Sequence, residues 1–187
     1  MAHVTPICDF GWKPPAFELP GTDGGIWTLE GIRGANGTLV MFICNHCPYV
    51  RSIIDRIAAD ARALQDMGIG IAAICANDAD VYPDDSFSNM KIFAAQNSFT
   101  FPYLQDETQE VARAWDAVCT PDFFGFNADL ELQYRGRLDE SGKEAAPPDV
   151  RRELLEAMRQ IAETAVAQPG RHRPWAVRSS ESGLKVK

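Results

Sequence analysis

The feature that most constrains the fold is a pair of cysteines that separates an apolar segment from a helical one. Residues 38–43 form a partly β-branched apolar run, which predicts a strand. From residue 47 to about 66, apolar side chains recur at helical spacing. Cys44 and Cys47 therefore lie where a strand ends and a helix begins. Free backbone N–H groups and the positive end of the helix dipole favour a thiolate at such a point.

Short strands and helices alternate along the rest of the chain. Two extended segments, 16–19 and 25–29, lie in a turn-rich lead-in and predict a β-hairpin around an Asp-Gly turn. Further along, the patterns predict a strand over 69–75, a helix over 85–97 capped by Asp84 or Asp85, a helix over 108–115, strands over 122–126 and 131–134, and a last helix that opens at 147–149. This order predicts an α/β protein with a mixed central sheet and helices on both faces.

Size and composition set the class of protein. The 187 residues predict one domain over 1–187, with a core over about 12–167 and a C-terminal tail over 168–187. A net charge of −8 argues against a nucleic-acid partner. No segment approaches the roughly 18 consecutive apolar residues of a membrane span, and no secretory signal is visible. We therefore expect a cytoplasmic protein with no membrane partner. The odd count of five cysteines fits a reducing compartment better than a disulfide scaffold.

The spacing of Cys44 and Cys47 predicts thiol–disulfide exchange, in which a thiolate attacks a substrate disulfide and a second thiol resolves the mixed disulfide. Cys44, at the strand end, is expected to be the more exposed, attacking thiolate, and Cys47 the shielded, resolving one. Lowering a thiol pKa by about two units corresponds to roughly 2.7 kcal/mol. Because a helix terminus supplies only about 0.3–1 kcal/mol, we expect His46 and the amides around Cys47 to contribute as well.

Other chemistries receive less support from the sequence. A zinc site would need more ligands than Cys44, His46 and Cys47 can provide unaided, and the chain has no second C-x-x-C and no spaced pair of histidines. His46 could also be only a solvated residue at the helix start. No phosphate-binding or dinucleotide-binding glycine motif is present either. We therefore expect neither a metal nor an organic cofactor.

Five segments in the same order resemble a known family. They are the CNHCPYV motif over 44–50, Asn77-Asp78, and residues 82–86, 102–107 and 119–124. Together they resemble the thioredoxin-like redoxins, which include TlpA-like reductases and AhpC/TSA-like proteins, and more narrowly a group of bacterial redoxins. The resemblance spans roughly residues 12–165. It implies a thioredoxin-like fold with a short N-terminal hairpin and an inserted helix over 85–97.

The same resemblance implies roles for further residues. Pro121 is expected to be a cis-proline, with Thr120 facing the dithiol, where an extended substrate could pair with its backbone. Asn45 is expected to contact the substrate too. His46 occupies the position of the histidine in protein disulfide isomerase, which implies a less reducing dithiol than one with proline there. If His46→Pro left the reduction potential unchanged, this role would be wrong.

Two further residues have alternative interpretations. Cys119 precedes Pro121 by two positions, so it could act as an extra thiol near the dithiol, or it could be a small buried residue. Asp78 follows the second core strand and could relay the Cys47 proton, or it could close a turn. Both residues are therefore accessory candidates.

Two other functions remain as alternatives to exchange. A peroxiredoxin-like thiol peroxidase would carry a P-x-x-x-[ST]-x-x-C pattern. Val40 and Met41 precede Cys44 here, and Met41 occupies the position that the pattern reserves for Ser or Thr. Met41 cannot donate a hydrogen bond to a bound peroxide. A non-catalytic redox sensor would form the disulfide without turnover. For exchange, the expected partners are a disulfide-containing protein or small-thiol substrate and a cellular thiol reductant.

Overall fold

A computed structural model describes residues 3–4, 9–141, 147, 149–166 and 176–177. Its centre is a five-stranded sheet in the order β6-β5-β4-β7-β8. The strands are β4 (Gly37–Phe42), β5 (Ile69–Cys75), β6 (Tyr103–Gln105), β7 (Asp122–Phe126) and β8 (Leu132–Gly136). The first three are parallel, whereas β7 is antiparallel to both β4 and β8. The expected mixed sheet is therefore confirmed.

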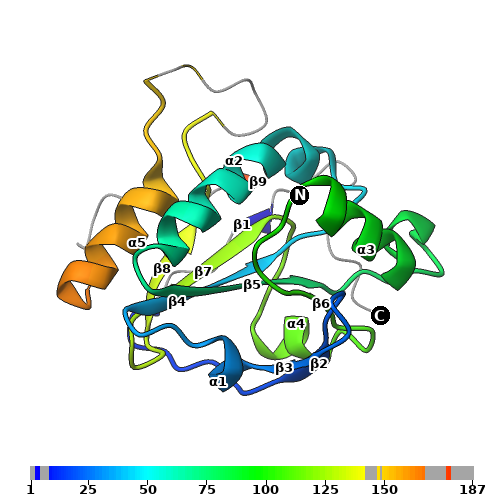
Figure 1. Ribbon diagram of the computed structural model, residues 1–187, viewed down its shortest axis with the longest axis horizontal. Coiled ribbons are helices and arrows are strands. Elements are labelled where there is room, and N and C mark those ends of the chain that lie inside the picture. The colour runs from blue at the N-terminus through cyan, green and yellow to red at the C-terminus, as the bar shows by residue number, and fades with distance from the viewer. Residues whose placement is uncertain (1–2, 5–8, 142–146, 148, 167–175, 178–187) are drawn as a thin grey trace.

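Helices cover both faces of this sheet (Figure 1). On one face lie α2 (Pro48–Gln65), α3 (Phe87–Gln96) and α5 (Glu153–Thr164), whose apolar side chains form one core. On the other face lie α1 (Leu29–Ile32), α4 (Glu110–Ala114) and the hairpin of β2 (Glu18–Pro20) and β3 (Ile26–Thr28). The short N-terminal hairpin is thus present as expected.

Strand β4 is largely apolar and is buried on both faces. Leu39 and Met41 pack into the core under α2, whereas Val40 and Phe42 pack into the core under α4. Side chains that alternate between two apolar layers give a continuous hydrophobic run rather than an alternating one. The strand ends at Phe42, and this end carries the chain directly to Cys44.

Several boundaries differ from the sequence expectations. The helix expected over 85–97 begins after a short 3-10 turn, η1 (Pro83–Asp85), and its N-cap is Ser86. Neither Asp84 nor Asp85 caps it, because the Asp85 carboxylate turns toward the cysteines instead. Helix α5 begins later than the proline pair suggested, and the sequence patterns missed the short elements α1 and β6.

Two short segments, one near each end of the described residues, pair in a small separate sheet. Strand β1 (His3–Val4) pairs antiparallel with β9 (Ala176–Val177), which lies within the expected tail. The rest of the tail and Cys8 lie outside the described residues. No helix in the described part of the chain is both long and apolar enough to cross a membrane.

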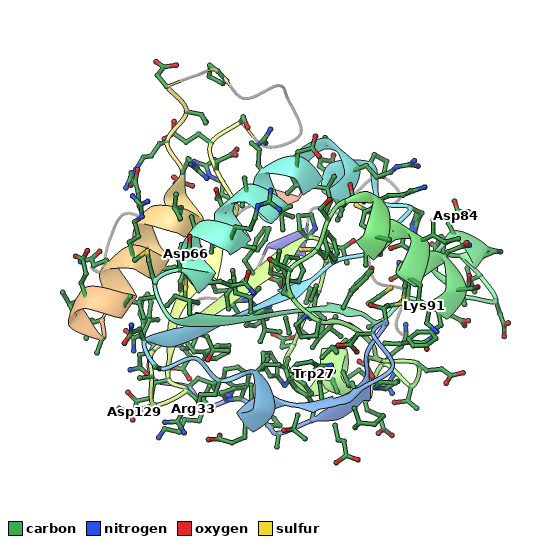
Figure 2. The ribbon with its side chains drawn as sticks, viewed as in Figure 1. Trp27, Arg33, Asp66, Asp84, Lys91 and Asp129 are labelled. Carbon is green, nitrogen blue, oxygen red and sulfur yellow. The ribbon has the colours of Figure 1, made fainter. Side chains whose placement is uncertain are left out.

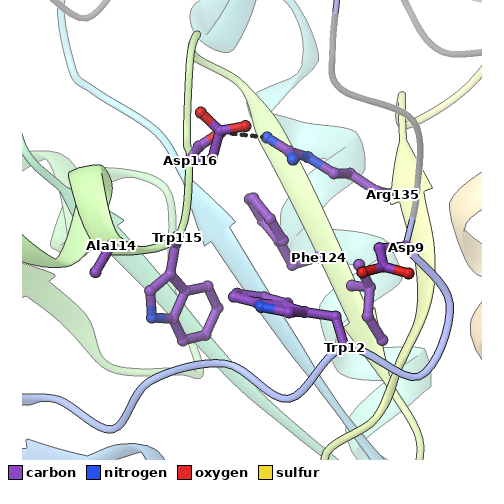
Figure 3. A pocket seen from close by; sticks show the side chains of 8 residues that line it. Asp9, Trp12, Ala114, Trp115, Asp116, Phe124 and Arg135 are labelled. Atoms are coloured by element: carbon purple, nitrogen blue, oxygen red, sulfur yellow. Dashed lines mark hydrogen bonds between the residues drawn. The ribbon is translucent and has the colours of Figure 1, made fainter.

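The core under α4 is aromatic and contains a pocket of about 230 Å³ beside Trp12, Trp115 and Phe124 (Figure 3). Arg135 lies over the Phe124 ring at 4.4 Å and forms an ion pair with buried Asp122 at 2.8 Å. Its guanidinium also donates to the backbone carbonyl of Asp116 at 2.6 Å. Because the cation is already paired, this pocket is best described as part of the packing around the sheet.

Candidate active site

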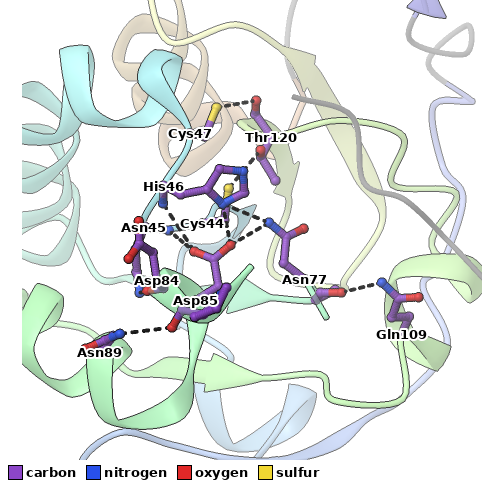
Figure 4. Close-up of polar contacts among 12 residues, drawn as sticks. Cys44, Asn45, His46, Cys47, Asn77, Asp84, Asp85, Asn89, Gln109 and Thr120 are labelled. Atoms are coloured by element: carbon purple, nitrogen blue, oxygen red, sulfur yellow. Dashed lines mark hydrogen bonds and ion pairs between the residues drawn. The ribbon is translucent and has the colours of Figure 1, made fainter. Parts of the chain in front are cut away.

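The two cysteines of the motif lie together between β4 and α2. Cys47 is the N-cap residue of α2, and Pro48 occupies the first helical position, where a missing N–H costs nothing. Thr120 contacts both cysteines: its Oγ1 lies 3.2 Å from Cys44 Sγ, and its carbonyl oxygen accepts from Cys47 Sγ at 3.4 Å (Figure 4). The Thr120–Pro121 peptide bond is cis, as the family resemblance implied.

Both cysteines are buried. Cys44 is 1% exposed and Cys47 is 0% exposed, so the structure does not have the difference in exposure that the sequence analysis expected. The reason is local: the loop that follows β5 covers Cys44, through contacts described below. Cys44 must therefore become exposed before it can react with a large substrate.

The two thiols also affect each other's pKa, and the expected attacking role of Cys44 stays a prediction. The Cys44 thiol donates a hydrogen bond to the Cys47 sulfur, and this bond, helped by the amides of Val50 and Tyr49, lowers the pKa of Cys47 to about 6. That same hydrogen bond, burial and the negative charge of Asp85 raise the pKa of Cys44. The two thiols therefore titrate as a coupled pair, and the reduced site carries one negative charge on that pair, next to the positive end of the helix dipole.

A buried carboxylate organises the loop between the cysteines. Asp85 Oδ1 accepts the backbone N–H groups of Asn45 at 2.7 Å and His46 at 3.2 Å. Its other oxygen, Oδ2, lies 2.5 Å from His46 Nδ1 and accepts from Asn77 Nδ2 at 2.8 Å. We call residues 44–47 the active-site loop and residues 77–85 the support loop. The support loop thus holds the active-site loop through one carboxylate (Figure 4).

Aromatic and polar contacts complete this arrangement. The His46 ring stacks on Tyr82, with ring centroids 4.3 Å apart and planes within 7°. The Asn45 side chain donates to the Asp84 carbonyl at 2.8 Å and accepts from the Tyr103 hydroxyl at 3.0 Å. Because Asn45 is buried and fully engaged, it fixes the loop. Its expected contact with substrate stays a prediction.

The donor set of Cys44, His46 and Asp85 resembles that of a metal site, since their ligand atoms lie within 4.8 Å of one another. However, each Asp85 oxygen already has two polar partners, and the 2.5 Å between His46 Nδ1 and Asp85 Oδ2 leaves no space for an ion between them. In this arrangement His46 and Asp85 bind each other, and Cys44 contacts Thr120.

The accessory candidates occupy different surroundings. Cys119 is buried and donates to the Pro121 carbonyl at 3.7 Å, and burial raises its pKa to about 12. This thiol stays protonated at neutral pH, in keeping with a small buried residue. Asp78 Oδ1 accepts the Asp80 N–H at 3.0 Å and so closes its own turn. The relay role of Asp78 and the extra-thiol role of Cys119 stay predictions.

The sequence analysis missed the most connected residue of the site. Residues 77–78 and 82–86 were among the segments that carried the family resemblance, yet Asp85 was assigned only a capping role. Its neighbour Asp84 has the same side chain, and both precede a helix, so no local pattern separates them. Only the fold places one carboxylate at the cysteines and the other at the surface.

The fold and the site define a class, that of thioredoxin-like proteins with a C-x-x-C dithiol at the start of the first long helix. The chain belongs to the AhpC/TSA family, which it matches over residues 10–136. None of the curated proteins compared with it matches.

Solved structures share this fold. The crystal structure of an uncharacterized conserved protein from Geobacillus kaustophilus is 39% identical, covers 93% of this chain and 92% of that chain, and has a TM-score of 0.85. The thioredoxin domain of a thiol-disulfide oxidoreductase from Bacteroides vulgatus is 16% identical; the match covers 69% of this chain and 89% of that chain, with a TM-score of 0.58. A peroxidoxin from Mycobacterium tuberculosis is 15% identical; the match covers 83% of this chain and 94% of that chain, with a TM-score of 0.58. The last two likenesses concern the fold alone.

Proposed function

We propose that the protein is a thiol–disulfide oxidoreductase that acts through the dithiol of Cys44 and Cys47. The observation that carries this proposal is that one residue contacts both sulfurs: Thr120 Oγ1 lies 3.2 Å from Cys44 Sγ, and the Thr120 carbonyl oxygen lies 3.4 Å from Cys47 Sγ. The two thiols also affect each other's pKa, which fits two sulfurs that lie close together. Two sulfurs in contact at a helix N-terminus can be joined or separated with little rearrangement of the backbone around them.

In the reducing direction, the first step uses Cys47 as the base. The Cys44 proton passes to the Cys47 sulfur along the hydrogen bond that joins them. The Cys44 thiolate then attacks one sulfur of the substrate disulfide, which forms a mixed disulfide and releases the other substrate sulfur as a thiolate.

The second step resolves the mixed disulfide. The released substrate thiolate takes the proton from Cys47, and Cys47 attacks the sulfur of Cys44. This attack forms the Cys44–Cys47 disulfide and releases the second substrate thiolate. Two electrons have then passed from the dithiol to the substrate. A cellular thiol reductant restores the dithiol, and the reverse sequence would oxidise a substrate dithiol.

The substrate class follows from the surroundings of the dithiol. A disulfide in a protein segment or a small thiol compound must approach beside Thr120, where an extended segment can pair with the backbone. The His46 side chain, 21% exposed, is the most accessible part of the active-site loop beside the sulfurs. The odd cysteine count supports a cytoplasmic location, where cellular thiols are the available reductants.

Family membership favours one alternative, a peroxiredoxin-like thiol peroxidase. In that reaction Cys44 would attack a peroxide and become a sulfenic acid, and Cys47 would condense with it to form the disulfide and water. Val40 and Met41 are buried in β4, so neither offers a side-chain donor to a peroxide. Exchange therefore has the stronger support.

Turnover assays separate these functions. We expect the reduced protein to reduce insulin or glutathione disulfide in the presence of a thiol reductant, and we expect Cys44→Ser and Cys47→Ser to abolish turnover. Cys75→Ala is the matched control, because Cys75 is buried in β5 and burial raises its pKa to about 12. A fast stopped-flow reaction with hydrogen peroxide, without disulfide reduction, would favour the peroxidase. A reversible disulfide without either turnover would favour a redox sensor.

A further inference from the structure

The support loop places one buried carboxylate against the active-site loop. We propose that Asp85 is a positioning residue that holds the active-site loop and, paired with His46, sets the reduction potential of the Cys44–Cys47 dithiol. This inference rests on the proposed exchange function, and it assigns the control of that function to a residue outside the C-x-x-C motif.

The geometry supports the positioning part of the proposal. Asp85 is 1% exposed and binds the backbone N–H groups of both residues between the cysteines. A buried carboxylate is stable only when its oxygens are hydrogen-bonded, and those of Asp85 have four polar partners. The loop can therefore change its conformation only by leaving that carboxylate unsatisfied.

The electrostatic part follows from the charges near the sulfurs. The negative charge of Asp85 contributes to the raised pKa values of Cys44, Cys75 and Tyr103, which shows that its field reaches across the site. Among the described residues, the ion pair of Asp85 is with His46, and no lysine or arginine forms one with it. The His46 ring is thus the ion-pair partner that can offset the Asp85 charge.

These charges act on the two redox states differently. The reduced site carries a thiolate, whereas the disulfide carries no charge. The negative charge of Asp85 raises the pKa of Cys44 and so favours the disulfide, whereas the His46 ring, which pairs with the Asp85 carboxylate, offsets that charge. Removing the Asp85 charge should therefore favour the dithiol, and removing His46 should favour the disulfide. A residue that only held the loop in place would not produce shifts of opposite sign.

The test measures the equilibrium constant for oxidation of the dithiol by glutathione disulfide. We expect Asp85→Asn to lower this constant at least tenfold, which is about 30 mV toward a more oxidising potential. His46→Gln alone should raise the constant at least threefold. In a double variant that also carries Asp85→Asn, the same substitution should have a smaller effect. Asp85→Glu keeps the charge and should stay within threefold of the wild type.

Asp84→Asn is the matched control. It removes one negative charge from the same 3-10 turn, but the Asp84 side chain is exposed and lies at the edge of the molecule near α3 (Figure 2). Its contact with Asn45 is made by the backbone carbonyl, which the substitution keeps. We expect the equilibrium constant of Asp84→Asn to remain within twofold of the wild type.

A second measurement needs no disulfide, so it separates this inference from the exchange function. In Cys47→Ser protein, Asp85→Asn should increase the rate of Cys44 alkylation by iodoacetamide at least tenfold, whereas Asp84→Asn should not. Unchanged alkylation, or shifts of the same sign in Asp85→Asn and His46→Gln, would overturn the proposal. If the Asp85→Asn protein does not fold, the test rests on His46→Gln alone. An equilibrium constant for oxidation that does not rise in His46→Gln would then overturn the proposal. Faster alkylation without any Cys44–Cys47 disulfide in the wild type would instead contradict the exchange function.

Discussion

Thr120 contacts both cysteines, Cys44 through its hydroxyl and Cys47 through its backbone carbonyl, and the hydroxyl stabilises negative charge on Cys44. The Thr120 hydrogen bond lowers the pKa of Cys44 against the larger effects that raise it. A hydrogen bond to a charged group contributes about 1.5–3 kcal/mol, which is roughly ten- to hundredfold in thiolate population. In Cys47→Ser protein, Thr120→Val should therefore slow Cys44 alkylation about tenfold or more, measured by peptide mass mapping. Thr120→Ser keeps the hydroxyl and should restore the rate; equal rates in the two variants would contradict this role.

The pKa of Cys47 depends chiefly on the hydrogen bond from Cys44. The folded protein holds this pKa at about 6, below the roughly 8.5 of a free cysteine. In the reduced wild type, thiolate absorbance should therefore increase as the pH rises through about 6. In Cys44→Ala the donor is absent, so the increase should move to higher pH. An identical titration in the two proteins would show that Cys44 does not stabilise the Cys47 thiolate.

Among the helices and strands, those with strong periodic patterns were predictable and those fixed by tertiary contacts were not. Strand β5 and helix α2 appeared close to their expected bounds because each has a long apolar pattern. Strand β6 has only three residues, too few for a periodic signal, yet its Tyr103 binds Asn45. The cysteines and Thr120 could be assigned to the site from sequence. The coupling between the two thiols and the carboxylate beside them could not, because both depend on tertiary contacts, including those of Asp85.

The close approach between α1 and β5 is an element-level feature that requires glycine. A Cβ atom at Gly70 would overlap the carbonyl oxygen of Ile32 and lie 2.6 Å from the Gly34 nitrogen. Both are backbone atoms, which cannot move aside as a flexible side chain can. We expect Gly70→Ala to reduce the free energy of unfolding by at least about 1–3 kcal/mol, measured by urea denaturation. An unchanged denaturation midpoint would contradict the described packing of α1 on the sheet.

The fold has two apolar cores, one on each face of the sheet, and the dithiol belongs to the core under α2. We therefore expect the opposite core to contribute to stability and not to the redox chemistry. Trp115 is fully buried in the opposite core and packs against Trp12, Phe17, Phe42, Phe124 and Phe126. Removing a large buried aromatic side chain costs about 3–5 kcal/mol. Trp115→Ala should therefore lower the unfolding free energy by that amount. Its folded fraction should keep the wild-type equilibrium constant with glutathione; a tenfold change would show that the two cores are coupled.

The most direct test of the account is to locate the disulfides after reaction with glutathione disulfide, by peptide mass spectrometry. The wild type should contain a Cys44–Cys47 disulfide, and Cys47→Ser should carry glutathione on Cys44 as a trapped mixed disulfide. In both proteins Cys75 and Cys119 should remain free thiols. A wild type in which Cys44 and Cys47 never become joined, or a Cys47→Ser protein whose glutathione lies on another cysteine, would contradict exchange through this dithiol.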